Sequence, residues 1–352
     1  MAGAGAFGRN HLRVLRELET ERAGVALVAA VDPDAARADE AARQYDIPVF
    51  ASVDALLKAD LKLDAACVAV PTVKHYEVAR ELLDKGLDLL IEKPLAATLA
   101  EADALIQNQK NIVQPGHLER FNPAVIAVEP GLTRPMFFEA HRLSVFSARA
   151  LDVDVVLDLM IHDLDIVLTF AKSPVREVRA VGLPILSPKV DIANVRVEFE
   201  SGCVANFTAS RVSTERVRKL RFFEPRQYVS IDYARRDVLV IKIDDKAAAG
   251  PNPQLAQAAA QFLATGKLDA SVIQAIVASG QVPAGLMMKV LAAKSDPEKL
   301  KEIARELAGP RAETGNDSSG GPAPGLSFVK PEVTPGEPLR LEILSFLESV
   351  RT

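Results

Sequence analysis

Three glycines near the start of the chain, Gly3, Gly5 and Gly8, stand in the order Gly-x-Gly-x-x-Gly. In a dinucleotide fold the first glycine permits a tight strand-to-helix turn. The second lets the backbone approach a pyrophosphate, and the third lets the helix pack closely on the strand. Amides at the start of the helix then bind the phosphates. The pattern therefore predicts a nucleotide site with contacts from these glycines, Ala6 and Phe7.

The segment after the glycines alternates between helix-like and strand-like patterns. The predicted helices are Asn10–Leu18, Ala35–Tyr45 and His75–Lys85. The predicted strands are Val25–Val31, Asp64–Val70 and Leu87–Ile91. Strands that alternate with helices of about 10 residues predict βαβ units and a parallel sheet.

The strand that should lead into the glycine loop is short of residues, because only Met1 and Ala2 precede Gly3. That strand is central in a doubly wound sheet, so its loss leaves two neighbouring strands with unpaired backbone groups. We therefore expect a Rossmann domain whose first strand is missing, and we hypothesise that the chain starts late. An upstream in-frame segment that encodes no β-rich apolar run would contradict this hypothesis.

From Pro135 onward the pattern changes to successive strand-like runs with few helices between them. These runs are Met136–Phe146, Val195–Phe199, Cys203–Ser210, Arg218–Phe223 and Tyr228–Tyr233. They predict a largely antiparallel sheet that packs against a helix near Val155–Phe170. The expected fold class is thus an α/β domain followed by an α+β domain with an open sheet.

Composition shifts suggest four regions. The predicted domains are a Rossmann dinucleotide-binding domain at 1–123, an α+β substrate and oligomerisation domain at 124–245, a helical insertion with a flexible linker at 246–325, and a C-terminal segment at 326–352. The last segment contains an amphipathic helix at Pro338–Val350.

Charge and composition argue against several classes of protein. The net charge of −5 and the absence of a basic cluster argue against a nucleic-acid partner. No apolar run approaches the roughly 20 residues that span a bilayer, and the amino terminus has no secretory pattern. Cys67 and Cys203 lie in apolar stretches and indicate buried thiols in a reducing compartment. We therefore expect a cytoplasmic protein with no membrane partner and, since metal-ligand spacings are absent, no catalytic metal.

Asp32 follows the predicted strand Val25–Val31, about 20 residues after the glycines, where a carboxylate binds ribose hydroxyls. A carboxylate at this position repels a 2′-phosphate, so the sequence favours NAD over NADP. The alternative is a glycine-rich arm in which Asp32 is only a turn residue before Pro33.

Lys93 follows the buried strand Leu87–Ile91 within the tripeptide Glu92-Lys93-Pro94. Asp158 and His162 are four residues apart, so on a helix they share one face. Histidine titrates near neutrality, as a general base for alcohol oxidation should, and a lysine can stabilise an alkoxide. The structural alternative is a solvated strand end and a surface pair on a helix.

The chain resembles the Gfo/Idh/MocA family of sugar and polyol oxidoreductases. The residues that carry the resemblance are Gly3–Gly8, Pro71-Thr72, Glu92-Lys93-Pro94 and Asp158-x-x-x-His162. It implies an NAD(P)-binding Rossmann domain, with Pro71, Thr72, Glu92 and Lys93 beside the cofactor, and a second domain with an open antiparallel sheet.

The same resemblance implies that Lys93, Asp158 and His162 surround the reacting carbinol. His162 would remove the hydroxyl proton as hydride leaves for the nicotinamide. Lys93 would stabilise the alkoxide or relay the proton, and Asp158 would orient the ring or the substrate.

A second constellation, at residues 116–123 and 158–165, resembles the branch of the family that oxidises C3 of UDP-linked N-acetylglucosamine. The substrate contacts that we expect are His117, Arg120, Asn122, Arg142 and Arg211. Their structural alternative is a hinge between domains that holds an arginine–carboxylate pair.

This second resemblance implies a nucleotide-sugar substrate. It also implies a partner aminotransferase that uses the keto product for a 3-amino sugar in lipid A or surface glycans, and a homo-oligomer, dimer or tetramer, formed through the open sheet. A free sugar or inositol dehydrogenase and a non-catalytic NAD-binding sensor are the alternatives.

Overall fold

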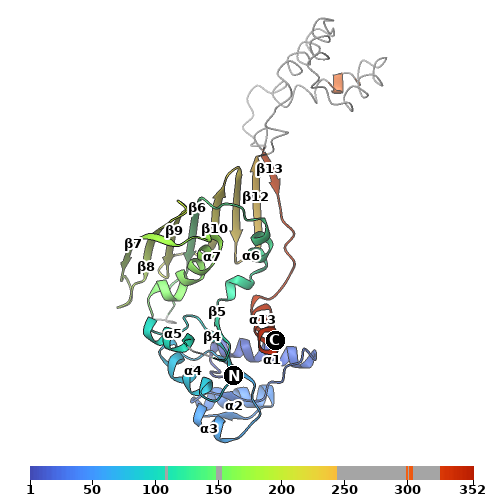
Figure 1. The fold of residues 1–352 in the computed structure, drawn as a ribbon, viewed down its shortest axis with the longest axis vertical. Helices are drawn as coiled ribbons and strands as arrows, with labels where there is room; N and C mark the ends of the chain where they lie inside the picture. Colours follow the sequence, from blue (N-terminus) through green and yellow to red (C-terminus); the bar gives the residue numbers. More distant parts are fainter. Residues whose placement is uncertain (108–109, 148–152, 244–298, 300, 304–325) are drawn as a thin grey trace, which may run out of the picture. The chain divides into compact units, whose positions relative to one another are not determined.

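The structure is a computed structural model that describes residues 1–107, 110–147, 153–243, 299, 301–303 and 326–352 (Figure 1). The chain divides into two compact units, which are described separately below. The first comprises Met1–Leu239 and Lys330–Thr352, and the second comprises Val240–Val329. The predicted insertion at 246–325 lies outside the described residues except for residues 299 and 301–303.

The amino-terminal part of the first unit alternates helices with short parallel strands, as predicted. The strands are β1 (Ala30–Val31), β2 (Val49–Phe50), β3 (Ala65–Val68), β4 (Asp88–Glu92) and β5 (Val113–Gly116). The helices are α1 (Ala6–Thr20), α2 (Ala35–Tyr45), α3 (Val53–Lys58), the 3₁₀ turn η1 (Thr72–Lys74), α4 (His75–Leu83) and α5 (Leu99–Ile106). Strand β1 pairs with β2, and β3, β4 and β5 pair in that order, all in parallel. This arrangement is the predicted Rossmann-type α/β layer.

The first three residues of the chain occupy the position between β1 and β3. Ala2 forms parallel bridges to both Val31 and Val68, through backbone hydrogen bonds of 2.8 Å. Because so few residues stand opposite it, the predicted strand Val25–Val31 is reduced to Ala30–Val31. The backbone groups that we expected to be unpaired are therefore bonded at this point of the sheet.

The second part of the first unit is a mixed, mostly antiparallel sheet. Its strands are β6 (Phe137–Leu143), β7 (Val175–Leu183), β8 (Ile192–Phe199), β9 (Val204–Ser210), β10 (Val217–Glu224), β11 (Gln227–Asp232) and the start of β12 (Asp237–Ile243). Their order is β12-β11-β10-β6-β9-β8-β7, and β6 pairs with β9 in parallel. The edge strand β7 and the strand β12 are additions to the predicted set. In the second unit, β13 (Leu326–Val329) pairs antiparallel with the last four residues of β12.

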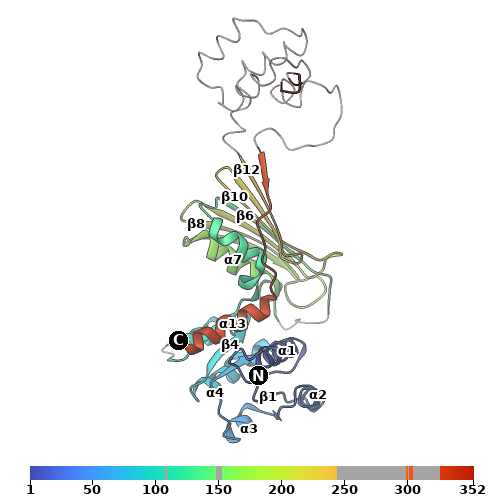
Figure 2. The same cartoon turned by 90° about the vertical axis from the view of Figure 1, so that its right-hand side faces the viewer.

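Helix α7 (Ile161–Ala171) covers one face of this sheet (Figure 2). Phe170 of α7 contacts Phe222 of β10, with ring centroids 6.0 Å apart, and Phe138 of β6 is buried beside Phe222. A π-helical turn, η4 (Val156–Met160), leads directly into α7. The predicted open sheet and its covering helix are thus confirmed.

Short helical segments connect the two parts of the first unit. The carboxyl-terminal segment of the chain packs against the amino-terminal part of this unit. The connecting segments are η2 (Leu118–Phe121), α6 (Pro123–Val128) and η3 (Glu129–Gly131). The final helix, α13 (Pro338–Arg351), lies beside α1 (Figure 1). Its Ile343 and Phe346 are buried in one apolar cluster with Leu12 and Leu15 of α1. Apolar spacing in the sequence predicted this helix correctly.

Candidate active site

The carboxyl ends of the parallel strands bring four predicted site residues to one edge of the sheet. Asp32 follows β1, Pro71 follows β3, Lys93 follows β4 and His117 follows β5. Open α/β sheets bind their ligands at this edge. The chain therefore places its candidate cofactor and catalytic residues where the fold forms a crevice.

The glycine loop has the shape of a phosphate cradle. A Cβ atom on Gly3, whose φ is +92°, would lie 2.6 Å from the carbonyl oxygen of Ala69, and one on Gly8 would lie 1.9 Å from that of Gly3. At Gly5 the nearest atom would be Nη1 of Arg37, 4.0 Å away, so this glycine leaves space for a ligand. Helix α1 begins directly after Gly5 with no side-chain cap, so its first amides are free of such a partner. These residues fit a pyrophosphate at the start of α1.

Asp32 lies where a ribose-binding carboxylate is expected, and it also supports the glycine loop. Its Oδ2 accepts a hydrogen bond of 2.8 Å from the amide of Ala4, and its Oδ1 accepts one of 2.9 Å from Asp34. Arg37 Nε lies 3.3 Å from the same Oδ1. A carboxylate accepts about four hydrogen bonds, so contact with a ribose is compatible with these partners. The ribose contact of Asp32 stays a prediction.

Lys93 meets Asp158 across 65 residues of sequence. Its Nζ donates a hydrogen bond of 2.7 Å to the backbone carbonyl of Asp158 and lies 3.5 Å from the side-chain Oδ1. Asp158 belongs to the π-helical turn η4, and turns of this kind often occur at functional sites. His162 follows on the first turn of α7. The predicted catalytic residues are thus brought together from two parts of the fold.

Burial weakens the positively charged forms of three side chains in this region. It lowers the pKa of Lys93 below 10.5, although Asp158 opposes the shift. Burial, with the nearby charges of Arg142 and Lys93, lowers the pKa of His162 well below 6.5, and burial also lowers the pKa of His117. Among the described residues, Nδ1 of each histidine is buried without a hydrogen-bond partner. We call Lys93, His117, Asp158 and His162 the reactive cluster.

Two histidines to which the sequence analysis assigned no role support the strand end that carries the reactive cluster. His11 Nε2 lies 2.8 Å from Oε1 of Glu92, and His75 Nδ1 lies 2.8 Å from the carbonyl oxygen of Pro94. Gly116 stands opposite Glu92 in the β4–β5 pairing, where a Cβ would come within 3.0 Å of the Glu92 backbone. The sequence shows that His11 lies within the apolar face of α1, which indicates a buried histidine. It does not show that the partner of His11 is Glu92, which is 81 residues away.

A buried ion-pair network joins Arg142 of β6 to Asp163 of α7 and Glu119 of η2. Arg142 binds Asp163 through two hydrogen bonds of 2.7 and 3.0 Å and Glu119 through one of 3.0 Å. Its guanidinium also lies over the ring of Tyr233, 4.9 Å from the centroid. Asn122 is buried and donates a hydrogen bond of 2.9 Å to Glu119. This geometry favours the structural alternative for Arg142 and Asn122, which we had expected to contact substrate.

The other predicted substrate contacts divide in the same way. Arg211 is buried, and its Nε donates a hydrogen bond of 2.8 Å to Asp191. Arg120 binds Asp165 of α7 through two hydrogen bonds of 2.7 and 2.6 Å but is half exposed. His117 Nδ1 lies 3.8 Å from Asp165. Of the predicted substrate contacts, His117 is the one that belongs to the reactive cluster.

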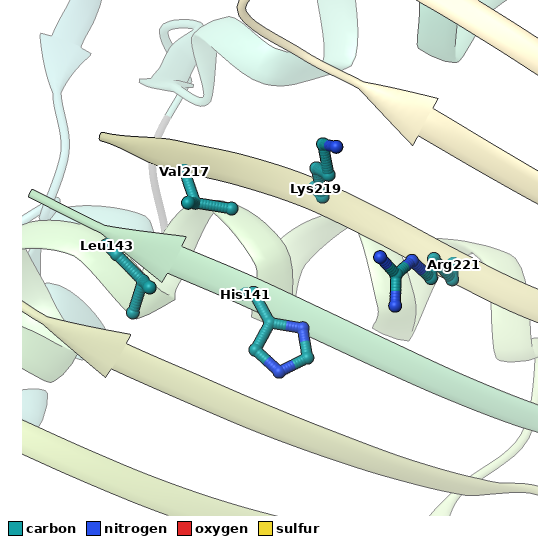
Figure 3. Close-up of a pocket in the computed structure, with 5 residues that line it drawn as sticks. All are labelled: His141, Leu143, Val217, Lys219 and Arg221. Carbon is teal, nitrogen blue, oxygen red and sulfur yellow. The ribbon is translucent and has the colours of Figure 1, made fainter. Parts of the chain in front are cut away.

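A shallow cavity of about 260 Å³ lies on the opposite face of the sheet from α7 (Figure 3). Its lining residues are His141 and Leu143 of β6 with Val217, Lys219 and Arg221 of β10. These positions alternate with the buried residues that face α7. The cavity is therefore separated from the reactive cluster by the thickness of the sheet.

Two structural findings concern membranes and metals. No helix in the described part of the chain is long and apolar enough to cross a membrane. Within the same residue ranges, no group of three or more His, Cys, Asp or Glu residues is arranged to hold a metal ion.

Comparison with known proteins identifies the family of this site. Residues 1–117 match the oxidoreductase family with an NAD-binding Rossmann fold, and residues 133–226 match the Gfo/Idh/MocA C-terminal domain. A UDP-N-acetylglucosamine 3-dehydrogenase of Acidithiobacillus ferrooxidans is 38% identical over 235 residues, which cover 66% of this chain and 72% of that protein. The chain belongs to the Gfo/Idh/MocA family. It is an NAD-dependent oxidoreductase.

A solved structure with the same enzyme name and organism, and a second relative, show the range of this family. The solved structure of the UDP-N-acetylglucosamine 3-dehydrogenase GnnA from Acidithiobacillus ferrooxidans matches with a TM-score of 0.72 and 27% identity, over 99% of this chain and 87% of that one. The scyllo-inositol 2-dehydrogenase (NAD(+)) of Bacillus subtilis is 27% identical over 229 residues, 60% of this chain and 66% of that protein. Members similar to this chain thus act on a nucleotide sugar or on an inositol.

Proposed function

We propose that the protein uses NAD to oxidise the C3 hydroxyl of UDP-N-acetylglucosamine to a ketone. The contact of Lys93 with Asp158 supports this proposal most directly. It joins the strand end beside the glycine loop to the helix that carries His162. A bound sugar carbinol would therefore have hydride acceptor, cation and base within one crevice. When bound, the nicotinamide accepts the hydride.

His162 takes the hydroxyl proton in this proposal. Its lowered pKa keeps the ring neutral near pH 7, which is the protonation state that a base needs. Lys93, as an ammonium, stabilises the alkoxide that develops as the proton leaves. Asp158 holds that ammonium in place through its backbone carbonyl and its carboxylate.

The second candidate is a dehydrogenase of a free sugar or inositol. The scyllo-inositol 2-dehydrogenase relative supports it, but with 27% identity against 38% for the UDP-N-acetylglucosamine enzyme. A non-catalytic NAD-binding sensor has less support, because such a protein needs no half-buried lysine and histidine with lowered pKa values beside its nucleotide site.

The test incubates the full chain with NAD⁺ and either UDP-N-acetylglucosamine, N-acetylglucosamine or myo-inositol, and follows the absorbance of the reduced nicotinamide. A trapping amine removes the ketone so that an unfavourable equilibrium does not hide turnover. We expect turnover with the nucleotide sugar and its loss in Lys93→Met. As a control, Lys58→Met removes an exposed lysine that pairs with Asp54 on α3 and should leave the rate unchanged.

Turnover of myo-inositol but not of the nucleotide sugar would replace the proposal with the inositol candidate. NAD binding without turnover of any of these compounds would favour the sensor. Turnover that survives in Lys93→Met would remove the proposed role of the lysine.

We further propose a biological setting for this reaction. The ketone is the substrate that an aminotransferase needs to make a 3-amino sugar for lipid A or surface glycans. The free, buried thiols of Cys67 and Cys203 suit the reducing cytoplasm. The open face of the sheet would form a homo-oligomer, a dimer or a tetramer, which light scattering on the purified chain would test.

A further inference from the structure

Arg218 shares the helix-covered face of the sheet with the core. On β10, Leu220 and Phe222 are fully buried beneath α7, and side chains alternate between faces along a strand. Arg218 is two residues before Leu220 and therefore points to the same face. Lys219 and Arg221 project from the other face, where they line the shallow cavity (Figure 3).

The packing of α7 on β10 places Arg218 near His162. Phe170 contacts Phe222, and from this contact the path back to His162 along α7 is about 12 Å. The path from Phe222 back to Arg218 along β10 is about 13 Å. Arg218 and His162 thus lie at similar distances from the contact between Phe170 and Phe222. If α7 and β10 run in the same direction from that contact, both residues lie at the amino-terminal end of α7.

The ion-pair network confirms that direction. Arg142 stands directly opposite Arg218 in the pairing of β6 with β10. It is also bound to Asp163, the residue next to His162. Arg218 is accordingly among the charges that lower the pKa of His162.

The neighbouring arginines differ from Arg218 in their partners. Arg120, Arg142 and Arg211 each bind a carboxylate of the chain through hydrogen bonds. Within the described residues, no carboxylate lies within ion-pair distance of the half-buried Arg218. Two arginines side by side on adjacent strands repel each other unless an anion compensates them. Burial and the charge of Arg142 accordingly lower the pKa of Arg218, and Glu119 offsets only part of the shift.

We propose that Arg218 binds the diphosphate of the sugar-nucleotide substrate and thereby selects sugar nucleotides over neutral polyols. This inference rests on the proposed function, since it assigns one residue to the substrate named there. A guanidinium binds phosphate oxygens through two parallel hydrogen bonds, and phosphate is the group that UDP-N-acetylglucosamine has and inositol lacks. The diphosphate would supply the ion-pair partner that Arg142 has in Asp163 and Glu119 and that Arg218 lacks among the described residues.

The test titrates UDP into the NADH-loaded full chain by calorimetry, which needs no turnover. In Arg218→Gln we expect the Kd for UDP to rise about 10- to 100-fold, as loss of a charged hydrogen bond predicts. The KM for UDP-N-acetylglucosamine should rise by a similar factor with little change in kcat. Arg218→Lys keeps the charge but loses the bidentate geometry, so its Kd for UDP should lie between those of the wild type and Arg218→Gln. Arg221→Gln, on the same strand but the opposite face, is the matched control and should bind UDP normally.

If Arg218→Gln binds UDP as tightly as the wild type does, this inference is overturned and the proposed function stays intact. A wild-type protein that binds NADH but neither binds UDP nor turns over the nucleotide sugar would overturn both. Titration with N-acetylglucosamine 1-phosphate, which has only the sugar-linked phosphate, shows which phosphate Arg218 binds. If Arg218→Gln weakens its binding as much as it weakens the binding of UDP, Arg218 is assigned to the sugar-linked phosphate. Melting temperatures establish that each variant is folded, and Arg218→Lys serves if the glutamine variant is not.

Discussion

Arg142 is buried and Lys93 is half-buried, both near the start of α7, and their surroundings shift their pKa values in opposite directions. Burial lowers the pKa of Arg142, but the ion pairs with Asp163 and Glu119 outweigh burial and raise it. Burial also lowers the pKa of Lys93, and the nearby carboxylates of Asp158 and Glu92 do not restore it. A cation that the chain itself neutralises holds the fold together. A cation that is only partly neutralised is available to stabilise negative charge on a ligand.

The first prediction concerns His162, the proposed base of the reactive cluster, where a substitution should affect catalysis. His162→Asn should lower kcat by about 10²- to 10⁴-fold, because general base catalysis contributes a factor of this size. The affinity for NAD should not change, since the glycine loop lies elsewhere. Steady-state kinetics and a cofactor titration measure the two quantities. A loss of less than threefold would show that His162 is not the base.

The second prediction concerns the ion-pair network, where the damage should be to stability. Arg142→Met leaves Asp163 and Glu119 buried without their cation, and breaking a buried pair costs about 3–5 kcal/mol of unfolding free energy. Urea unfolding measures the difference. Arg221→Met removes a more exposed pair with Glu139 at 3.4 Å and should cost less than about 1 kcal/mol. Equal losses in the two variants would contradict the distinction between buried and exposed pairs.

A third buried ionisable group, Glu342 on α13, has no ion-pair partner among the described residues, so it sharpens the comparison. Both of its oxygens are buried without hydrogen-bond partners among the described residues. Burial, and then the charge of Glu92, raise its pKa from 4.5 to about 8, although His11 opposes the shift. The unfolded chain releases this proton at lower pH than the folded chain, so stability should fall as the pH rises from about 4.5 to 8.

Glu342→Gln should remove this decline, a change on the order of a few kcal/mol at pH 8. Melting curves between pH 5 and about 9 measure it. His11, whose pKa rises to about 10 because hydrogen bonds with Cys67 and Glu92 outweigh burial, leaves a residual decline between about pH 6.5 and 10. Glu348→Gln, at an exposed position of the same helix, is the control. A decline of the wild-type size that persists in Glu342→Gln below about pH 6.5, where His11 does not contribute, would contradict the assignment.

The smallest expected effect is on the pH profile of kcat/KM. The pKa of His162 lies well below 6.5, so activity should hold through pH 6.5 on the acid side. Above the lowered pKa of Lys93 the ammonium loses its proton, so activity should fall at a pH below 10.5. In Lys93→Arg, whose guanidinium stays charged, this alkaline decline should disappear. An acid limit at pH 6.5 in the wild type would indicate a solvated histidine.

Local patterns predicted most of the elements that frame the site. Helix α2 has the predicted bounds of Ala35–Tyr45, because its alanine-rich stretch is bounded by a capping Asp34 and by Asp46, which adopts the left-handed conformation. The predicted Val25–Val31 was too long, because strand length depends on what lies alongside. Edge strand β7, which is exposed on both faces, has no alternation of apolar and polar residues from which to predict it.

The same limit applies to the site. The sequence marks a lysine at a strand end and an Asp/His pair four residues apart, and the structure brings Lys93 Nζ within 3.5 Å of Asp158 Oδ1. The arginines could not be sorted in this way. Arg142, Arg211 and Arg218 all lie in strand-like or adjacent segments, and sequence spacing does not show which of them has a carboxylate partner.

The sequence by itself determined the fold class, the glycine loop and the identity of the candidate catalytic residues, since these depend on local turns, periodicity and residue chemistry. The tertiary structure decided which charges are neutralised. The partners of Arg142 and Lys93 come from elements 21 and 65 residues away, and the pKa of a buried group depends on its neighbours in space. Burial and pairing are properties of the packed chain, and they separate the arginines that hold the fold from the one that we assign to substrate.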